Sequence, residues 1–304
     1  MQEIELVISV SAEIQPIFSK ETVKMRVSKG SFLLLAILSF LLFSGCRTCC
    51  GPQTVLDSII FQNKWHGDID KIQFNEPSGI CWHSQRKTLF VIGDEGDICE
   101  IETDGSLIKQ KHIRDSDFEG VTHDPATGLL YAVIEEEEAV IEIDPETFGI
   151  SREFKIPRDF GGKTLLKSGG EGIEAITFIP DPKHAEGGIF YLANQAFTLT
   201  DEEDISAVFQ VELPLRTKMG EPRLIGYFKP GIIDLSGLHY DQATGHILLI
   251  SDSTNTLLEY SLEHELLNVY AFPGDNQEGI TLDPEGFVYI AQDSGGIIKL
   301  KWLR

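Results

Sequence analysis

Apolar and polar residues follow a short, repeating pattern along most of the chain. One start, a small or acidic residue followed by glycine and an aliphatic residue, recurs five times, at Ser78-Gly79-Ile80, Glu119-Gly120-Val121, Glu171-Gly172-Ile173, Ser236-Gly237-Leu238 and Glu278-Gly279-Ile280. Each start leads into a short strand, and a second strand follows as a run rich in β-branched and aromatic residues, typical of a buried strand, at 89–92, 130–134, 190–193, 247–250 and 287–291. A further run alternates apolar and polar residues, as in V-I-E-I-D at 140–144, and indicates a strand with one buried face.

The repeats have the length and the turns of β-propeller blades. D-P-A-T-G at 124–128, D-Q-A-T-G at 241–245 and D-P-E-G at 283–286 separate the first and second predicted strands, and their Pro and Gly suit tight turns. A fourth strand is predicted at 107–113, 152–156, 223–228 and 267–272. The glycines of successive starts lie 41, 52, 65 and 42 residues apart, as expected for four-stranded blades of about 40 to 45 residues with loop insertions. The sequence therefore predicts an all-β propeller of five blades, unless the longest interval holds a sixth.

The N-terminal part of this region is predicted to close the ring. The last repeat reaches the end of the chain at Arg304 without a fourth strand, whereas I-D-K-I-Q-F at 69–74, before the first repeat, has the fourth-strand pattern. Pairing of this N-terminal strand with the last blade would remove the exposed sheet edges.

The first residues carry an export signal. The run 32–43 has 12 residues without a charge, fewer than the roughly 20 that a membrane-spanning helix needs, and Arg26 and Lys29 precede it as in a signal peptide. It ends in L-F-S-G-C at 42–46, which resembles a bacterial lipobox and would make Cys46 the lipidated N-terminus of the mature protein. The alternatives are a cleaved signal without lipid or a short buried helix.

The resulting domain plan has four parts. Residues 1–24 carry four acidic residues ahead of the positive region, which is wrong for an export signal, so we expect the true start at Met25. Residues 25–45 form the lipoprotein signal peptide, 46–54 a linker and 55–304 the propeller. Arg47 after Cys46 is not the Asp associated with inner-membrane retention, which favours the outer membrane by analogy.

Charge and cysteines narrow the class of protein. Lys and Arg number 25 against 48 Asp and Glu, a formal charge of −23, so the chain as a whole lacks a basic footprint for nucleic acids or anionic headgroups. Cys81 and Cys99 are predicted on strands separated by a third strand, about 10 Å apart and beyond disulfide reach. We therefore expect two buried thiols.

Two rings of oxygen-bearing side chains are predicted around the propeller axis. The first precedes each start glycine: Ser78, Glu119, Glu171, Ser236 and Glu278. The second follows the second strand of each blade: Asp94, Glu135, Gln195, Asp252 and Asp293. Carboxylates gathered near one axis either have raised pKa values or are compensated by a cation, and a hard cation with oxygen ligands, Ca²⁺ before Mg²⁺, is the economical answer. The alternative is a set of solvated acids at the channel mouth; Glu174 and Asn194 could add oxygens.

These motifs resemble the SdiA-regulated (YjiK-like) family of envelope β-propeller lipoproteins. The resemblance covers roughly residues 55–304 and rests on the E-G-I/V starts, the D-P-x-G turns and the lipobox-like N-terminus. It implies a five-bladed propeller with Ca²⁺ in the central cavity and no settled biochemical activity. Glu119, Glu171 and Glu278 match the acidic starts, whereas Ser78 and Ser236 depart from them.

Three functions are compatible with this sequence. The first is a monomeric, lipid-anchored envelope propeller with a channel calcium site, which binds or scaffolds an unidentified protein or small-molecule ligand. The second is a calcium-dependent hydrolase, either a phytase-like phosphomonoesterase or a lactonase. Phosphate binding would require cationic side chains, for which Lys163 and Lys167 are the nearby candidates. The third is a structural role in the envelope without a small-molecule site. None of the three involves nucleic acid.

Overall fold

The computed structural model describes residues 59–69, 74–135, 137–217 and 219–304. The chain divides into two units, Met1–Val55 and Leu56–Arg304, and all described residues belong to the second. The predicted upstream start, signal peptide, lipidated Cys46 and linker lie outside the described residues. Within the described ranges, no helix has the length and apolar character needed to cross a bilayer.

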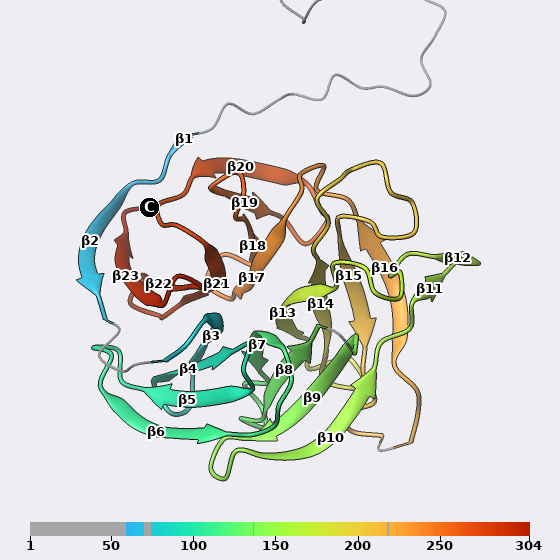
Figure 1. Cartoon of the computed structure of the whole chain (residues 1–304), viewed down its shortest axis with the longest axis horizontal. Helices are drawn as coiled ribbons and strands as arrows, with labels where there is room; N and C mark the ends of the chain where they lie inside the picture. The colour runs from blue at the N-terminus through green and yellow to red at the C-terminus, as the bar shows by residue number, and fades with distance from the viewer. Residues whose placement is uncertain (1–58, 70–73, 136, 218) are drawn as a thin grey trace, which may run out of the picture. The chain divides into compact units, whose positions relative to one another are not determined.

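Five antiparallel sheets surround a central axis, which confirms the predicted five-bladed propeller (Figure 1). In blades 1 to 4 the innermost strand comes first in the chain and the next three strands follow outward. Blade 1 contains β3 (Pro77–His83), β4 (Thr88–Gly93), β5 (Asp97–Ile101) and β6 (Leu107–His112). Blade 2 contains β7 (Phe118–His123), β8 (Leu130–Ile134), β9 (Ala139–Asp144) and β10 (Gly149–Lys155).

Blade 3 accounts for the longest interval between repeats. It contains β13 (Ile173–Pro180), β14 (Gly188–Asn194), β15 (Ala207–Glu212) and β16 (Arg223–Phe228), and a hairpin of β11 (Asp159–Phe160) and β12 (Lys163–Thr164) precedes it. The extra residues lie in loops, and the described part of this interval forms no sixth blade. Blade 4 contains β17 (Leu235–Asp241), β18 (His246–Ser251), β19 (Thr256–Tyr260) and β20 (Leu266–Ala271).

An N-terminal strand closes the ring, as predicted. Blade 5 combines β21 (Gln277–Leu282), β22 (Phe287–Gln292) and β23 (Gly296–Trp302) with β2 (Asn63–Asp68), which pairs antiparallel with β23. The predicted position of this strand, 69–74, was wrong, because the closing strand is the segment directly before it, Asn63–Asp68. Ile69 and Phe74 are instead buried in the apolar cluster between blades 5 and 1.

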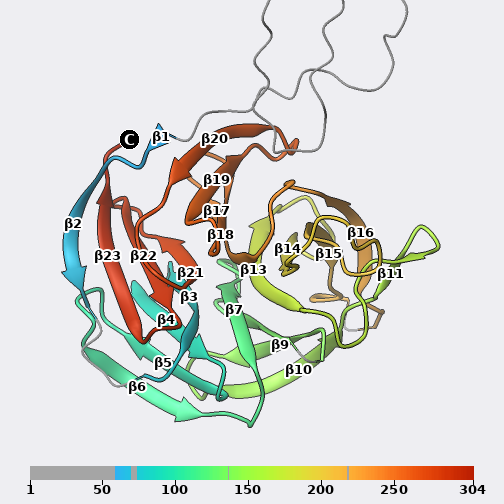
Figure 2. The same cartoon turned by 45° about the horizontal axis from the view of Figure 1, so that its top comes forward.

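A clasp next to β2 joins blades 4 and 5. The short strand β1 (Ile59–Ile60) pairs parallel with β20 of blade 4, so residues 59–68 bridge two blades (Figure 2). Phe61 is buried between them, with its ring 5.8 Å from Tyr270, 5.2 Å from Phe272 and 4.9 Å from Trp302. All ring-forming strands pair within Leu56–Arg304, and we therefore treat this segment as a complete folding unit.

The core consists of apolar clusters between neighbouring blades. Each of the five clusters of described residues takes side chains from two adjacent sheets, and together they continue around the ring. Near the axis, glycine permits close backbone contact: a Cβ added at Gly79 would lie 2.2 Å from the carbonyl oxygen of Glu119. Cys81 and Cys99 are buried thiols on β3 and β5, with β4 between them, which confirms their predicted state.

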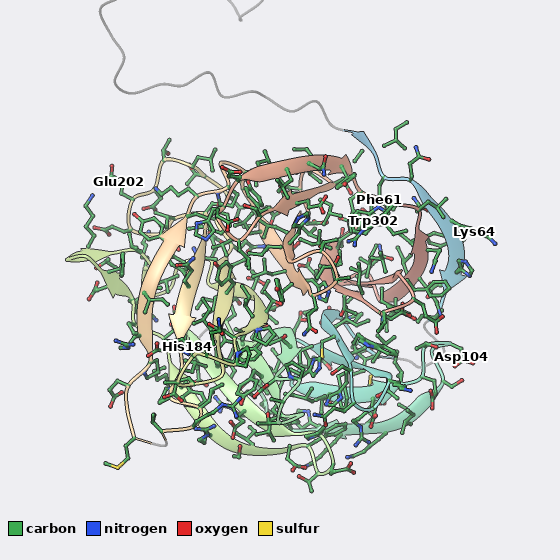
Figure 3. All side chains as sticks on the ribbon, turned by 180° about the vertical axis from the view of Figure 1, so that it is seen from behind. Phe61, Lys64, Asp104, His184, Glu202 and Trp302 are labelled. Carbon is green, nitrogen blue, oxygen red and sulfur yellow. The ribbon has the colours of Figure 1, made fainter. Side chains whose placement is uncertain are left out.

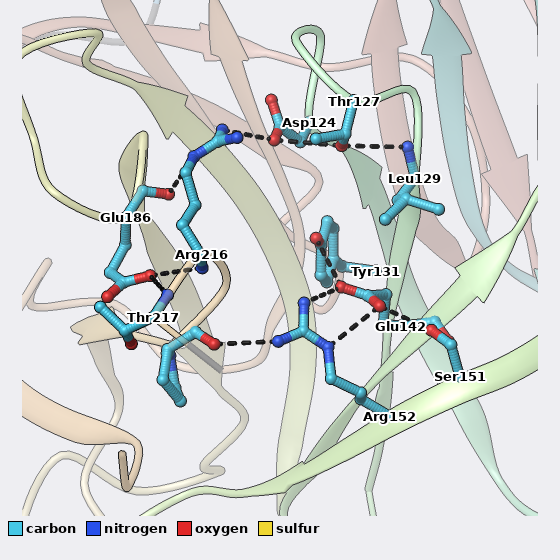
Figure 4. A network of polar contacts seen from close by, with 11 residues as sticks. Asp124, Thr127, Leu129, Tyr131, Glu142, Ser151, Arg152, Glu186, Arg216 and Thr217 are labelled. Atoms are coloured by element: carbon cyan, nitrogen blue, oxygen red, sulfur yellow. Dashed lines mark hydrogen bonds and ion pairs between the residues drawn. The ribbon is translucent and has the colours of Figure 1, made fainter. Parts of the chain in front are cut away.

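Polar contacts connect blades 2 and 3 at the end of the channel that bears the D-P-A-T-G turn (Figure 4). Arg216 donates a hydrogen bond of 2.9 Å to Asp124 in this turn, and its backbone N–H donates one of 2.6 Å to Glu186. Arg152 pairs with Glu142 and donates a bond of 2.9 Å to the carbonyl oxygen of Pro214. Each carboxylate has a cation or an N–H donor, so this network is structural and does not call for a ligand.

Candidate functional site

The predicted first ring exists, but the structure changes one of its members. Every inner strand contains a register shift where it enters the sheet. The shift spans Ser78, Glu174, Ser236 or Glu278 in four blades, and Glu119 with Gly120 in blade 2. Such β-bulges change the direction of a side chain, and they do so here at the same height in all five blades.

Glu171 does not belong to this ring, contrary to the sequence prediction. It is exposed and precedes β13, while Glu174 occupies the bulge and is buried. Glu171 was predicted because it directly precedes a glycine, as in the other repeats, but Gly172 has a φ of 94° and belongs to the loop. Ala175 takes the place of the start glycine in this blade, and its Cα would lie 2.8 Å from a Cβ added at Gly120.

The second ring has a common backbone environment. In four blades the backbone N–H of the second-ring residue donates a hydrogen bond of 2.9–3.2 Å to the carbonyl oxygen of the residue directly before the inner strand. These second-ring residues are Glu135, Gln195, Asp252 and Asp293. Asp94 follows β4 in the corresponding place of blade 1. The predicted positions are therefore equivalent in the structure, whereas their role as metal ligands stays a prediction.

Three carboxylates meet at the junction of blades 1 and 2. One oxygen from each of Asp94, Asp117 and Glu119 lies within 4.8 Å of the other two, and Ser78 donates a hydrogen bond of its hydroxyl to Asp94. Among the described residues this is the one cluster of acidic, His or Cys side chains that meets this criterion. Asp117 was not among the predicted ligands, although an acid directly before an inner strand also occurs at Asp234 and could have served as the signal.

The remaining predicted ligands surround this cluster without joining it. Glu135, Asp252, Glu278 and Asp293 lie at the same end of the channel. Asp252 accepts a hydrogen bond of 2.8 Å from the backbone N–H of Gln277. Asn194, named as a further oxygen donor, uses its amide N–H to contact Asp204 and Ile205, and its Oδ1 is buried without a partner in the described structure.

Burial and mutual repulsion raise the pKa values of these acids. Burial, and then the Asp94 and Asp117 carboxylates, hold the pKa of Glu119 well above its usual range. Burial and Glu119 do the same to the pKa of Glu174, which shares a hydrogen bond with Glu119. Burial, with Asp252 and Asp234, raises the pKa of Glu278 to about 8. At this end of the channel the surrounding groups do not stabilise all of these carboxylates in their charged form. A bound proton or a cation therefore compensates the negative charge.

The channel is closed near the bulges and open to the side above them. The start glycines and their neighbours leave a cavity of about 10 Å³ at the axis, the lower limit for one water molecule. Beside the carboxylate cluster, an open cavity of about 520 Å³ is lined by Asp94, Glu95, His112, Asp115, Ser116 and Asp117. The lining contains no Lys or Arg. Lys163 is exposed on β12, and the Lys167 ammonium lies 3.7 Å from Asp201.

Comparisons with known proteins agree with this fold. The model of the family described as SdiA-regulated matches residues 60–295. The crystal structure of Myxococcus xanthus glutaminyl cyclase is similar, with a TM-score of 0.52, 12% identity, and coverage of 81% of this chain and 97% of that one. At this identity the likeness shows the fold alone. No curated protein matches the chain.

Proposed function

This chain belongs to the SdiA-regulated family, and on that premise we propose that it is a lipid-anchored propeller of the cell envelope with a divalent cation in its channel. Its role would be to bind or scaffold a partner, with the cation stabilising the end of the ring that receives it. The carrying observation is the cluster of Asp94, Asp117 and Glu119, whose oxygens lie within 4.8 Å of one another.

The donor set fits a hard cation. All three side chains offer carboxylate oxygens, which Ca²⁺ and Mg²⁺ prefer, and Ca²⁺ is the better match because it tolerates irregular ligand sets. The group is held in place, since Glu119 is buried in a bulge and Asp94 is bonded to Ser78. A bound divalent cation would supply the positive charge that lowers the repulsion among these carboxylates.

Lipid anchoring rests on the sequence. The apolar run at 32–43, the preceding Arg26 and Lys29, and L-F-S-G-C at 42–46 support modification of Cys46. The described structure begins at Ile59, 13 residues after that cysteine, so a short tether would connect the lipid to the ring.

The open cavity favours a second candidate, a cation-dependent hydrolase. A cavity of about 520 Å³ shares Asp94 and Asp117 with the cluster, and a small substrate would fit it. The absence of Lys and Arg from its lining disfavours a phosphomonoester, whose charge needs cationic groups, and leaves an uncharged ester such as a lactone.

Thermal unfolding of Leu56–Arg304 tests the cation site. The midpoint is measured in EDTA and then with added Ca²⁺ or Mg²⁺, because a ligand that binds only the native state raises it. A Ca²⁺-selective rise supports the proposal and justifies a screen of lactones and phosphomonoesters. An unchanged midpoint with both cations would show that the carboxylates are compensated by protons and solvent alone, and the hydrolase would be excluded with the site.

A further inference from the structure

The rim of blade 5 carries positive charge in an otherwise acidic chain. The formal charge of the whole sequence is −23, yet residues 59–67 and 294–304 contain no Asp or Glu. These two segments form β1, β23 and all of β2 except its last residue, Asp68, and they contribute four cationic residues, Lys64, Lys299, Lys301 and Arg304. We call the surface formed by β1, β2 and β23 the clasp rim.

Among the described residues, three of these four cations have no carboxylate partner, and the Lys64 side chain has no polar partner at all. Arg304 donates a bond of 2.5 Å to Asp241, and Lys299 donates one of 2.8 Å to the carbonyl oxygen of Thr103. Lys301 contacts the carbonyl oxygen of Glu285 and lies 4.6 Å from the ring centre of Phe287. The side chain of Lys64 is exposed and makes neither a hydrogen bond nor an ion pair with the described residues.

Two of these lysines face each other across the sheet. Lys64 of β2 is directly opposite Lys301 of β23 in the strand register. Like charges in this position repel and destabilise the pair. An anionic surface laid against the rim would turn this repulsion into attraction, whereas nothing within the described part of the chain does so.

Exposed apolar side chains accompany the lysines. Ile60 is 77% exposed, Trp65 55% and Leu303 52%, and the N–H of Leu303 donates a bond of 2.8 Å to the carbonyl oxygen of Gln62 in the clasp. Tryptophan favours the interface between headgroups and hydrocarbon, and Lys and Arg favour anionic headgroups. Figure 3 shows Phe61 and Trp302 together at the clasp, with Lys64 farther out on β2.

The clasp rim is also where the chain enters the ring. Cys46 precedes Ile59 by 13 residues, which span at most roughly 45 Å when fully extended. A lipid on Cys46 would thus hold this rim at high effective concentration near the bilayer. The acidic remainder of the surface opposes this contact weakly, because charges more than about 8 Å away are screened at physiological ionic strength.

We infer that the clasp rim rests on a bilayer with anionic phospholipid headgroups, with Lys64 and Lys301 on the headgroups and Trp65 and Ile60 in the interface. This inference rests on the lipid-anchoring part of the proposed function and adds an orientation of the propeller on its membrane. Lys64 and Trp65 are successive residues of the outermost strand β2 and flank its edge on opposite faces, so it is this edge that meets the bilayer, with Ile60 on the adjoining β1 and Lys301 one strand further in on β23.

Vesicle sedimentation of Leu56–Arg304, which lacks the lipidation site, tests the inference. The vesicles are phosphatidylcholine alone or with about a quarter phosphatidylglycerol. We expect binding to the anionic vesicles only, because each lysine contributes about 1 kcal/mol there. Lys64→Gln with Lys301→Gln should therefore weaken binding about 25-fold, or about fivefold for each lysine. Trp65→Ser should weaken it without changing the selectivity for anionic vesicles.

The matched control is Lys163→Gln with Lys183→Gln, which removes two exposed lysines from blade 3 and its neighbouring hairpin. Unchanged binding of this control supports the clasp rim. Three results would overturn the inference: equal weakening of binding in the control and test variants, equal binding to both kinds of vesicle, or no binding to either. The assay contains neither the lipid anchor nor Ca²⁺, so a negative result would contradict only the clasp rim. The lipid anchor is tested separately by cell fractionation, and the cation site by thermal unfolding.

Discussion

Replacing Glu119 by glutamine should abolish cation binding while leaving the fold intact. The substitution keeps the size of the side chain and removes one of the three clustered carboxylates. In EDTA the variant should unfold at a temperature equal to or above that of the parent. Burial and the Asp94 and Asp117 carboxylates already hold the pKa of Glu119 well above its usual range, so its charged form is unfavourable there.

Calcium should stabilise the parent and not the variant. A ligand at about 100 times its Kd that binds only the folded state adds about 2.7 kcal/mol. For a domain of this size each kcal/mol raises Tm by about 2–4 °C, so the parent should gain about 5–10 °C. Losing one of three clustered oxygen donors should remove most of that gain.

Calorimetry of Leu56–Arg304 at constant ionic strength provides the measurement, with Mg²⁺ as the second cation. Glu202→Gln is the matched control, because it removes an exposed acid from the β14–β15 loop without touching the cluster. The control should respond to Ca²⁺ like the parent. If Glu119→Gln also gained the full increment, the cation would bind elsewhere and the interpretation of the cluster would be wrong.

Three further predictions address pH, packing and anchoring. In EDTA the parent should lose more stability than Glu278→Gln as the pH rises from 4.5 to about 8, because the raised pKa of Glu278 makes the folded parent bind more protons than its unfolded state over this window; equal slopes of Tm against pH for the two proteins would contradict the assignment. Gly79→Ala should destabilise the ring by about 1–3 kcal/mol in urea unfolding, because its Cβ would lie 2.2 Å from a backbone oxygen, and a change below the measurement error would show that the blades move apart easily. Cys46→Ser should release the protein from membranes on cell fractionation, and full retention would argue against lipidation at this cysteine.

Much of the fold was predictable because each blade repeats a local pattern. Alternation, β-branched runs and D-P-x-G turns report which residues face a neighbouring sheet, and this information is contained within about ten residues. The five starts therefore identified the blades and the second ring. The closing strand was displaced because I-D-K-I-Q-F and N-K-W-H-G-D are both compatible with an edge strand, and the choice depends on pairing with β23, far away in the chain.

The candidate site was predictable only in part, for the same reason. Asp94 and Glu119 were identified from their positions in the repeat, whereas Asp117 was missed because it precedes the inner strand and only the packing of blade 1 against blade 2 brings Asp94 close to it. Glu171 was selected over Glu174 because glycine was taken as the marker of the axis. The actual marker is any residue small enough for backbone contact, and alanine meets that requirement at Ala175.

The net charge is another property whose distribution on the surface the sequence alone does not reveal. By itself the sequence determined the fold class, a ring of five or six blades, the closure by an N-terminal strand, the buried thiols and the equivalence of the second-ring positions, because these follow from local periodicity and turn chemistry. A formal charge of −23 could not reveal a cationic rim, since Lys64 and Lys301 are 237 residues apart and become neighbours only when the ring closes. The tertiary structure alone decided which acids share a cluster, which side chains meet across blades and which surface the two ends of the ring create together, because those distances depend on how separately encoded sheets pack around one axis.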